Sequence, residues 1–337
     1  MRPGSARAEC VRRPDVSIDT MWNLEIPQAN RFVVGANLPW IGYGTDFGAS
    51  AWYPEGGLSA RPAALARLRQ TLASLEADGI PVVRAFVLCD GRSGILFDGG
   101  GLPTRLDDRF YADFDALLSS AREHHVRVLP TLLDFHLCSP LRTANGVQLG
   151  GRAHLIGDPD ARAAFIERIL KPIFERYGAD DTVAAWDVMN EPEWCLDRLR
   201  APGWRRDRGE ILQQFLHDAV QCGRASAGQP LTVGSAGLWN LDLVRPLGLD
   251  FYQIHWYERF GWASLARPVR ELKLDRPAIL GEFSGRASRW AVAEVLDAAR
   301  TAGYRGALVW SVLSEDEQSA YTAEIVAWIR SRGRDTV

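Results

Sequence analysis

The sequence lacks an excess of charge of either sign. Its 337 residues include 39 Lys and Arg against 42 Asp and Glu, which gives a net charge of −3. Nucleic acids and anionic membrane surfaces are bound mainly by strongly basic surfaces, so we expect neither as the main partner. Long hydrophobic runs are also missing. No window approaches about 18 continuous apolar residues, the length that a membrane-spanning helix needs.

Metal-binding patterns are missing as well. The five cysteines are scattered, with no CxxC pair and no Cys/His cluster at zinc spacing. We therefore expect unpaired thiols in a reducing compartment, no metal and no cofactor. No apolar run of signal-peptide length occurs near the start. We expect a flexible leader over residues 1–30, a cytoplasmic location, and a monomer or weak homo-oligomer.

No Pro/Gly/Ser-rich linker, charge block or internal repeat divides the remainder, so residues 31–337 are expected to form one domain. Short β-rich runs alternate there with longer amphipathic stretches, eight of each. The candidate strands are 32–38, 81–88, 127–133, 183–189, 231–234, 251–256, 278–282 and 306–311.

The stretches between these runs have the features of helices. Leucines recur at steps of three and four from Leu65 to Leu75, which places them on one helical face. Asp158 and Pro159 supply an N-cap and a first helical residue. The last two helices are expected over 288–302 and 319–329. Nearly all-apolar strands, each followed by a helix, indicate a parallel sheet with a covered outer face. Eight such units favour the α/β class and a single (β/α)8 TIM barrel over two doubly wound domains.

Chemistry in such a barrel is built at the C-terminal ends of the strands. Charged groups are rarely buried unless they are paired, so charged side chains that converge on one barrel mouth favour a functional interpretation. The polar and aromatic residues at these ends are Asn37, Trp40, Arg84, Asp134, His136, Asn190, Glu191, His255, Tyr257, Glu282 and Trp310.

Two inward-facing carboxylates with an arginine beside one of them suit acid/base and nucleophilic work at an acetal carbon. A cation such as Arg84 favours the ionised form of its neighbour, and that charge, with partial burial, raises the pKa of the second carboxyl. A divalent metal site is the alternative for carboxylates at a barrel mouth. It is disfavoured because the acids are interleaved with Trp, Asn and His, without a strand-end series of three acids.

The run Trp-Asp-Val-Met-Asn-Glu-Pro over residues 186–192 resembles the fourth-strand signature of retaining β-glycoside hydrolases of clan A. The run Leu-Gly-Glu-Phe over residues 280–283 resembles the seventh-strand signature. The order of the other strand-end residues resembles glycoside hydrolase family 5 and its close relatives, which include β-mannanases, cellulases and exo-glucanases. The resemblance covers roughly residues 31–333.

This resemblance implies that Glu191 is the general acid/base and Glu282 the nucleophile, with their carboxyl groups about 5–5.5 Å apart. It implies that Arg84 keeps Glu282 ionised, that Tyr257 donates a hydrogen bond to Glu282, and that His255 lies near Glu191.

For substrate binding, the resemblance implies that Asn190 bonds the sugar 2-hydroxyl, that His136 lines the site of the cleaved sugar, and that Trp310 forms a sugar platform. The peptide bond after Trp310 is a candidate non-proline cis bond. We group Asn37, Trp40, Arg84, His255 and Tyr257 with the substrate-binding residues, although Asn37 could instead tie the first strand to a neighbouring loop.

The function predicted from these residues is retaining hydrolysis of β-linked gluco- or manno-configured oligosaccharides or glycosides. A transglycosylase would use the same residues but exclude water. Two alternative functions belong to other classes: a catalytically silent barrel that binds carbohydrate, and a metal-dependent lyase or aldolase. The choice between gluco and manno substrates, the linkage, and exo or endo action are left open.

Overall fold

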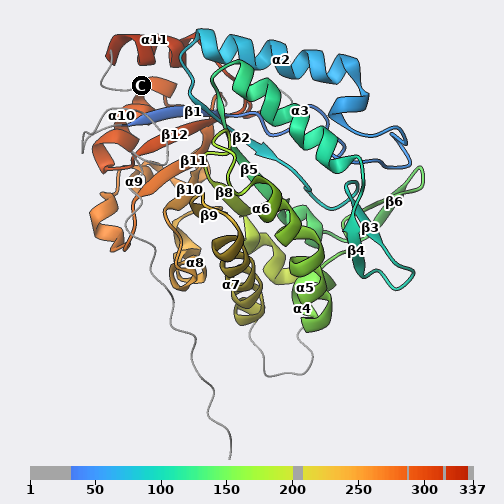
Figure 1. Ribbon diagram of the computed structural model, residues 1–337. Coiled ribbons are helices and arrows are strands. Elements are labelled where there is room, and N and C mark those ends of the chain that lie inside the picture. Colours follow the sequence, from blue (N-terminus) through green and yellow to red (C-terminus); the bar gives the residue numbers. More distant parts are fainter. Residues whose placement is uncertain (1–31, 200–207, 287, 314–315, 333–337) are drawn as a thin grey trace, which may run out of the picture.

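The computed structural model describes residues 32–199, 208–286, 288–313 and 316–332, so the expected leader over residues 1–30 lies outside the described residues. Eight parallel strands close into a barrel in the order β1-β12-β11-β10-β9-β8-β5-β2 (Figure 1). The expected TIM barrel is confirmed. The strands are β1 Val33–Asn37, β2 Val82–Phe86, β5 Arg127–Asp134, β8 Trp186–Asn190, β9 Leu231–Ser235, β10 Tyr252–Trp256, β11 Ala278–Ser284 and β12 Gly306–Trp310.

The strands read as apolar runs because both of their faces are buried. Inside the barrel, a small apolar cluster takes side chains from seven of the eight strands and the residues that precede them, among them Val33, Val82, Leu129 and Leu308. The outward side chains join a much larger core shared with the helices. Above the small cluster the interior becomes polar, beginning with the fully buried Arg84. The change from an apolar to a polar interior marks the end of the barrel at which the candidate site lies.

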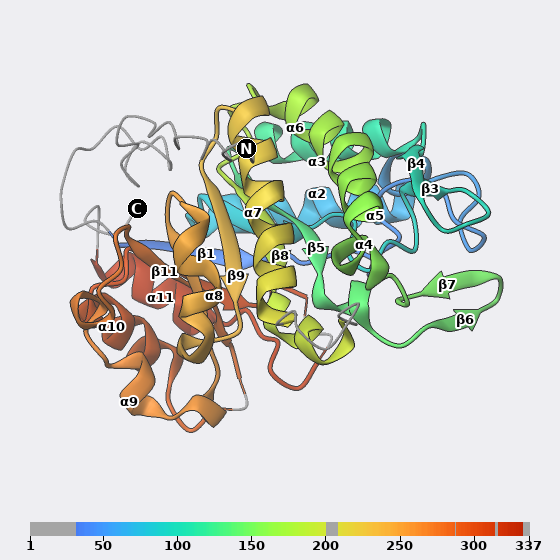
Figure 2. The same cartoon turned by 90° about the horizontal axis from the view of Figure 1, so that it is seen from below.

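Helices cover the outside of the barrel (Figures 1 and 2). The leucine pattern lies in α2 Pro62–Ala77 as predicted. The predicted cap is confirmed too, because Asp158 accepts hydrogen bonds from the backbone N–H groups of Asp160 and Ala161 at the start of α5. The helices are α2 Pro62–Ala77, α3 Phe110–Glu123, α4 His154–Gly157, α5 Pro159–Phe165, α6 Lys171–Tyr177, α7 Arg208–Ser226, α8 Leu241–Val244, α9 Trp262–Leu265, α10 Val292–Ala302 and α11 Ala323–Arg332.

The last two helices begin about four residues later than the sequence pattern indicated, at Val292 and Ala323. Before α10, the backbone N–H of Arg289 donates to the carboxylate of Glu258, and that of Ala291 donates to Glu294. Before α11, the backbone N–H of Ala320 donates to the carbonyl of Trp310. These contacts fix both preceding segments in non-helical conformations.

Two of the long loops contain hairpins that the sequence analysis treated as plain loop. The loop after β2 holds the antiparallel pair β3 Ile95–Phe97 and β4 Pro103–Leu106, and the loop after β5 holds β6 Arg142–Ala144 and β7 Val147–Leu149. Figure 2 shows the second hairpin projecting from the body of the barrel. Both add walls at the C-terminal side of the barrel.

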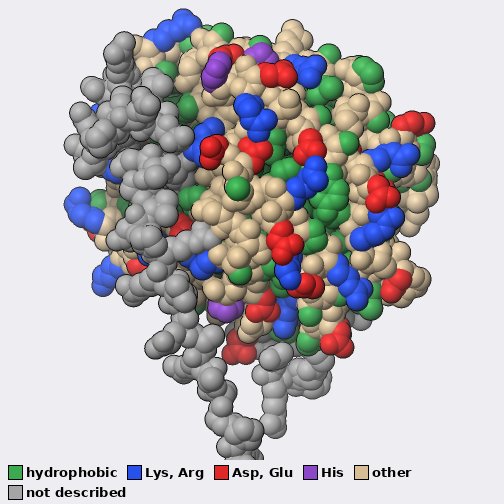
Figure 3. All heavy atoms as spheres, viewed as in Figure 1, with side chains coloured by type: hydrophobic (Ala, Val, Ile, Leu, Met, Phe, Trp, Pro, Cys, Tyr) green, Lys and Arg blue, Asp and Glu red, His purple; other side chains and the backbone are tan. Residues whose placement is uncertain are grey.

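The surface shown in Figure 3 intersperses Lys and Arg with Asp and Glu, without a broad field of one sign. Among the described helices, none has both the length and the apolar character needed to cross a bilayer.

Candidate active site

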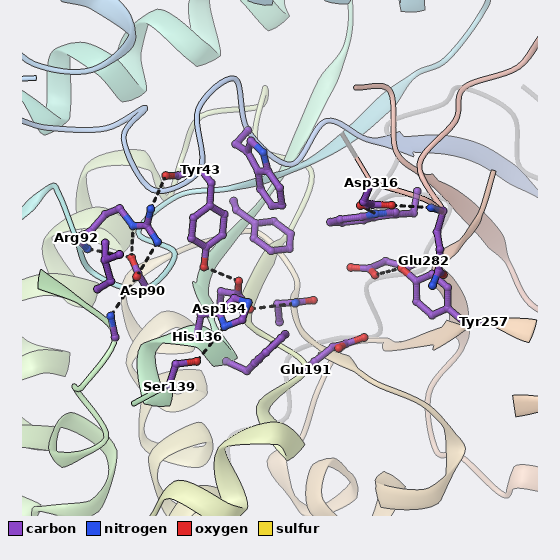
Figure 4. A pocket seen from close by; sticks show the side chains of 18 of the residues that line it. Tyr43, Asp90, Arg92, Asp134, His136, Ser139, Glu191, Tyr257, Glu282 and Asp316 are labelled. Carbon is purple, nitrogen blue, oxygen red and sulfur yellow. Dashed lines mark hydrogen bonds and ion pairs between the residues drawn. The ribbon is translucent and has the colours of Figure 1, made fainter. Parts of the chain in front are cut away.

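A cavity of about 730 Å³ opens at the C-terminal ends of the strands. Figure 4 shows its lining, with Glu191, Tyr257 and Glu282 on one side and Asp90, Arg92 and Ser139 on the other. Seven of the ten predicted site residues line it: Trp40, His136, Asn190, Glu191, Tyr257, Glu282 and Trp310. The structure thus brings together side chains from strands that lie far apart in the chain.

Glu282 lies at a β-bulge. Relative to β10, strand β11 carries one extra residue between Leu280 and Glu282, and the register with β12 shifts over the same stretch. A bulge re-aims the side chains that follow it, and here Glu282 enters the cavity. Arg84 Nη1 donates to Glu282 Oε1 at 2.6 Å, and the Tyr257 hydroxyl donates to Oε2 at 2.6 Å. Both oxygens of this carboxyl are therefore held by donors.

Glu191 follows β8 in a left-handed backbone conformation, with φ 44° and ψ 52°. This region is unfavourable for a residue with a side chain and occurs at functional sites that the surrounding structure enforces. His255 Nδ1 lies 2.9 Å from Glu191 Oε1, and the Trp194 indole N–H donates to Oε2 at 2.7 Å. Glu191 as a whole residue is 8% exposed and lines the cavity.

The two carboxyl groups face each other across a short gap. One oxygen of Glu191, one of Glu282 and a ring nitrogen of His255 all lie within 4.8 Å of one another. Retaining glycosidases hold their two carboxyl groups about 5–5.5 Å apart, whereas inverting enzymes leave about 6.5–9.5 Å for a water molecule. One oxygen of each carboxyl group lies within 4.8 Å of the other, which is closer than the inverting spacing and favours the retaining arrangement.

Arg84, Asn37 and His255 do not line the cavity, which differs from their grouping with the substrate-binding residues. All three are at most 1% exposed and lie beneath the cavity floor. Asn37 donates to the backbone carbonyls of Gly281 and Val309 and accepts from Arg84 Nη1. Asn37 therefore ties β1 to strands β11 and β12, rather than to a neighbouring loop, and also supports Arg84.

The guanidinium of Arg84 is the centre of the polar layer. It donates to Asp187 at 2.9 Å and to the side-chain oxygen of Asn190 at 2.9 Å, besides Glu282 and Asn37. Glycine is required beside it, because a Cβ on Gly234 would lie 2.9 Å from Arg84 Nη2. A buried charge is tolerated when its partners satisfy it in this way.

Burial raises the pKa of both Glu191 and Glu282, and Arg84 opposes that rise at each of them through its charge. Of these two carboxyl groups, only that of Glu282 accepts hydrogen bonds from Arg84 and Tyr257, so Glu282 is the one better held in the ionised form. Burial also lowers the pKa of His255 to about 4. The imidazole is neutral near pH 7, and we assign its Nδ1 proton to the hydrogen bond with Glu191 because that nitrogen faces the carboxyl.

The other predicted side chains form the walls of the cavity. Asn190 donates weakly to Asp134, at 3.3 Å, and His136 contacts Ser139. Trp310 is fixed by a hydrogen bond from its indole N–H to Asp316 at 2.8 Å. Trp310 forms an aromatic wall of the cavity together with Trp40, Tyr43 and Phe86, whose rings contact one another. The Trp310–Ser311 peptide bond is cis, as predicted.

Several lining residues were not found from the sequence. Asp90 and Arg92 form a two-pronged ion pair with distances of 2.8 and 2.9 Å, and Tyr43 donates to Asp134 at 2.7 Å. Arg142, Arg259 and Asp316 also line the cavity. All of them lie in loops rather than at strand ends. Among these residues, only Arg259 has a sequence position that indicates the cavity, because it lies two residues after the predicted site residue Tyr257.

Within the described residues, Glu191, His255 and Glu282 also have the composition of a cation site. The Arg84 guanidinium is already 2.6 Å from Glu282. A divalent cation here would place further positive charge beside that buried guanidinium, which the low-dielectric interior makes costly. The arrangement suits a proton and a carbon electrophile better than a metal ion.

No family model matches the chain, but the curated proteins and solved structures similar to it include β-mannanases. The chain is 26% identical to a mannan endo-1,4-β-mannosidase of Mytilus edulis, with 86% of each chain covered. It is 24% identical to one of Cryptopygus antarcticus, over 83% of this chain and 80% of the relative. Solved structures of the same fold include the β-mannanase of Mytilus edulis (TM-score 0.70, 22% identity, 91% and 93% covered) and the endo-1,4-β-mannanase of Eisenia fetida (TM-score 0.72, 22%, 91% and 94%).

Proposed function

We propose that this chain, a glycoside hydrolase of the family 5-like group in clan A, cleaves β-1,4-mannosidic bonds within oligosaccharide or polysaccharide chains with retention of configuration. The observation that carries the proposal is the pair Glu191 and Glu282. One oxygen of each lies within 4.8 Å of the other, and only the carboxyl group of Glu282 accepts hydrogen bonds from Arg84 and Tyr257.

In the first step of this proposal, a carboxylate oxygen of Glu282 attacks the anomeric carbon of the bound sugar. The bond from that carbon to the glycosidic oxygen breaks, and Glu191 transfers its proton to the departing oxygen. The products are a covalent glycosyl-enzyme on Glu282 and a leaving sugar with a free hydroxyl. Burial raises the pKa of Glu191 toward the range of a general acid. It raises the pKa of Glu282 as well, but the hydrogen bonds from Arg84 and Tyr257 favour the ionised form of Glu282 and so support the two roles.

In the second step, the ionised Glu191 removes a proton from a water molecule, whose oxygen attacks the anomeric carbon. The ester bond to Glu282 breaks, and its carboxylate is regenerated beside Arg84 and Tyr257. Two inversions at one carbon give net retention. The neutral His255 supports both steps by keeping one oxygen of Glu191 in place, 2.9 Å from its ring nitrogen.

The manno-configured substrate is supported by the relatives, which are named as mannan endo-1,4-β-mannosidases. Cleavage within a chain is supported by the shape of the cavity. It extends from Glu282 and Trp310 to Asp90 and Ser139, well past the carboxylate pair (Figure 4). The aromatic residues Trp40 and Trp310 offer flat apolar faces for sugar rings along that cavity.

The test compares the wild type with Glu282→Ala on β-linked manno-, gluco- and xylo-oligosaccharides. We expect the wild type to cleave the manno series preferentially and Glu282→Ala to lose at least about 10³-fold in turnover. Azide, acting in place of the missing nucleophile, should partly restore cleavage of an activated mannoside and give the inverted glycosyl azide. Preference for the gluco series would contradict the substrate assignment, and full activity in Glu282→Ala would contradict the mechanism.

Two alternatives give different results in the same assay. A transglycosylase would form longer oligosaccharides in preference to hydrolysis products when the acceptor concentration is raised. A silent binding barrel would bind manno-oligosaccharides without turnover in either variant. The intact pair of carboxyl groups favours hydrolysis.

A further inference from the structure

Trp194 is in direct contact with the carboxyl group that we assign as the acid/base. Its indole N–H donates to Glu191 Oε2 at 2.7 Å, while Oε1 faces His255 Nδ1 at 2.9 Å. His255 is buried, whereas Trp194 is 44% exposed. The buried His255 therefore contacts one oxygen of this carboxyl, and the partly exposed Trp194 holds the other, Oε2.

The local fold fixes Trp194 in this place. A 3₁₀ helix over Pro192–Arg198 follows Glu191, and the backbone N–H of Trp194 donates to the carbonyl of Glu191 at 3.2 Å. The neighbouring Glu193 is buried, and both of its carboxyl oxygens lie 3.2 Å from the backbone N–H of Ala236 at the end of β9. The indole ring lies beside that of the exposed Trp239, with ring centroids 6.3 Å apart and the ring planes inclined by 59°.

The hydrogen bond from Trp194 distinguishes the two protonation states of Glu191. An N–H donor binds a carboxylate oxygen more strongly than an oxygen of the neutral acid, because the acceptor is then charged. In the first step of the reaction Glu191 loses its proton and becomes a carboxylate. The Trp194 bond thus strengthens along the reaction coordinate, which is the condition for accelerating a step rather than only binding its reactant.

We propose that Trp194 is a positioning residue for the acid/base. Its indole N–H holds Oε2 of Glu191 and stabilises the carboxylate that remains when the proton has passed to the leaving sugar. The inference rests on the proposed function in its assignment of Glu191. It concerns a side chain that does not line the cavity and that acts on the substrate only through Glu191.

Other charged and titratable groups also act on Glu191 and form the background to this effect. They are Arg84 on β2, Asp134 and His136 at the end of β5, His255, Tyr257 and Arg259 at the end of β10, Glu282 on β11, and Glu193 on the same loop. All of these side chains are retained when Trp194 is replaced by phenylalanine. The substitution keeps a six-membered aromatic ring and removes the N–H donor together with the five-membered ring of the indole, and the same loss of ring size occurs in the control variant Trp239→Phe.

The kinetic test compares Trp194→Phe with Trp239→Phe, a matched replacement of a ring that is 48% exposed. Loss of the donor should move the alkaline limb of the pH profile of kcat/KM upward by about one unit for mannotetraose, since ionised Glu191 becomes less stable. At the pH optimum kcat/KM should fall about fivefold. With a dinitrophenyl mannoside, which leaves without protonation, it should be unchanged. In Trp239→Phe all values should equal the wild type.

A second measurement does not require turnover. In protein labelled with ¹⁵N-tryptophan, the indole N–H signal that disappears in Trp194→Phe should shift with pH in the wild type as Glu191 titrates. In Glu191→Gln that shift should be absent.

Kinetic profiles of Trp194→Phe identical to the wild type, or a Trp194 signal whose titration persists in Glu191→Gln, would overturn the proposal. Absence of mannan cleavage by the wild type, with the signal titrating as expected, would count against the proposed function and leave the Trp194–Glu191 contact supported.

Discussion

At the scale of single residues, the account depends on how Arg84 is satisfied. Its guanidinium is fully buried and donates to four side chains on three other strands: Asn37 on β1, Asp187 and Asn190 on β8, and Glu282 on β11. Removing one partner of a buried charge costs several kcal/mol, because the remaining charge is left without compensation. Arg84 therefore couples the stability of the barrel interior to the charge on Glu282. Replacing Arg84 by an apolar residue would remove the positive charge that keeps Glu282 ionised.

Tyr257→Phe removes one of the two donors to Glu282 and leaves the ring in place. A donor to a carboxylate lowers its pKa, so its loss should raise the pKa of Glu282, which must be ionised to attack. We expect the acid limb of the pH profile of kcat/KM to move upward by about one unit, with about tenfold lower kcat/KM below that limb. The profile is measured with mannotetraose between pH 3 and 8.

The control for this substitution is Tyr43→Phe. The Tyr43 hydroxyl faces the same cavity but donates to Asp134 at 2.7 Å rather than to Glu282. Its removal should leave the acid limb where it is in the wild type. Equal shifts in both variants would mean that the limb does not report Glu282.

At the scale of the elements, the loop after β8 is anchored by Glu193. This carboxyl is 5% exposed, and burial raises its pKa to about 8. Between about pH 4.5 and pH 8, the folded protein therefore keeps a proton on Glu193. The unfolded chain, in which the pKa is near 4.5, has released it over most of that range. Stability from this group is present at low pH and is lost as the pH rises toward about 8.

Glu193→Gln should remove this dependence while keeping an acceptor for the Ala236 N–H. The slope of the free energy of unfolding against pH between 5.5 and 7.5 should differ between the two proteins by about 1.4 kcal/mol per pH unit, with the wild type losing more stability as the pH rises. Urea unfolding at three pH values measures both slopes. Parallel slopes would show that Glu193 is ionised in the folded protein throughout this range.

The strands and their order were predictable because each apolar run sits between turn residues and long amphipathic stretches. Glu191 and Glu282 were predictable because short runs around each carry a recognisable pattern. The two hairpins were missed because strands of three or four residues, such as β6 and β4, are too short to show a periodicity. The starts of α10 and α11 were placed too early because contacts from distant loops override local propensity there.

The partners of the site residues were less predictable than the residues themselves. Tyr43 bonds Asp134 across 91 positions, and Arg84 bonds Glu282 across 198. Trp194 lies only three positions from Glu191, but its contact depends on a left-handed residue that no local pattern indicated. Asn37 and His255 were correctly placed near the site, yet burial makes them supports of Arg84 and Glu191 rather than contacts of the sugar.

At the scale of the whole molecule, the closed barrel brings residues from the ends of eight strands to one face, and the loops after β1, β2, β5, β8, β10 and β12 line the cavity. The apolar interior below and the polar layer around Arg84 give that face a rigid floor. A cavity that continues past the carboxylate pair suits a chain of sugars better than a single ring. These features together support retaining cleavage of a β-linked mannan chain.

The most direct test of this account is the configuration of the first product. Mannopentaose is cleaved by the wild type in deuterated water, and the anomeric proton of the new reducing end is followed by NMR before mutarotation. The short separation of Glu191 and Glu282 predicts that the β-anomer is released first and converts to the α-anomer only later. Initial release of the α-anomer would mean inversion by direct attack of water and would contradict the assignment of Glu282 as a nucleophile.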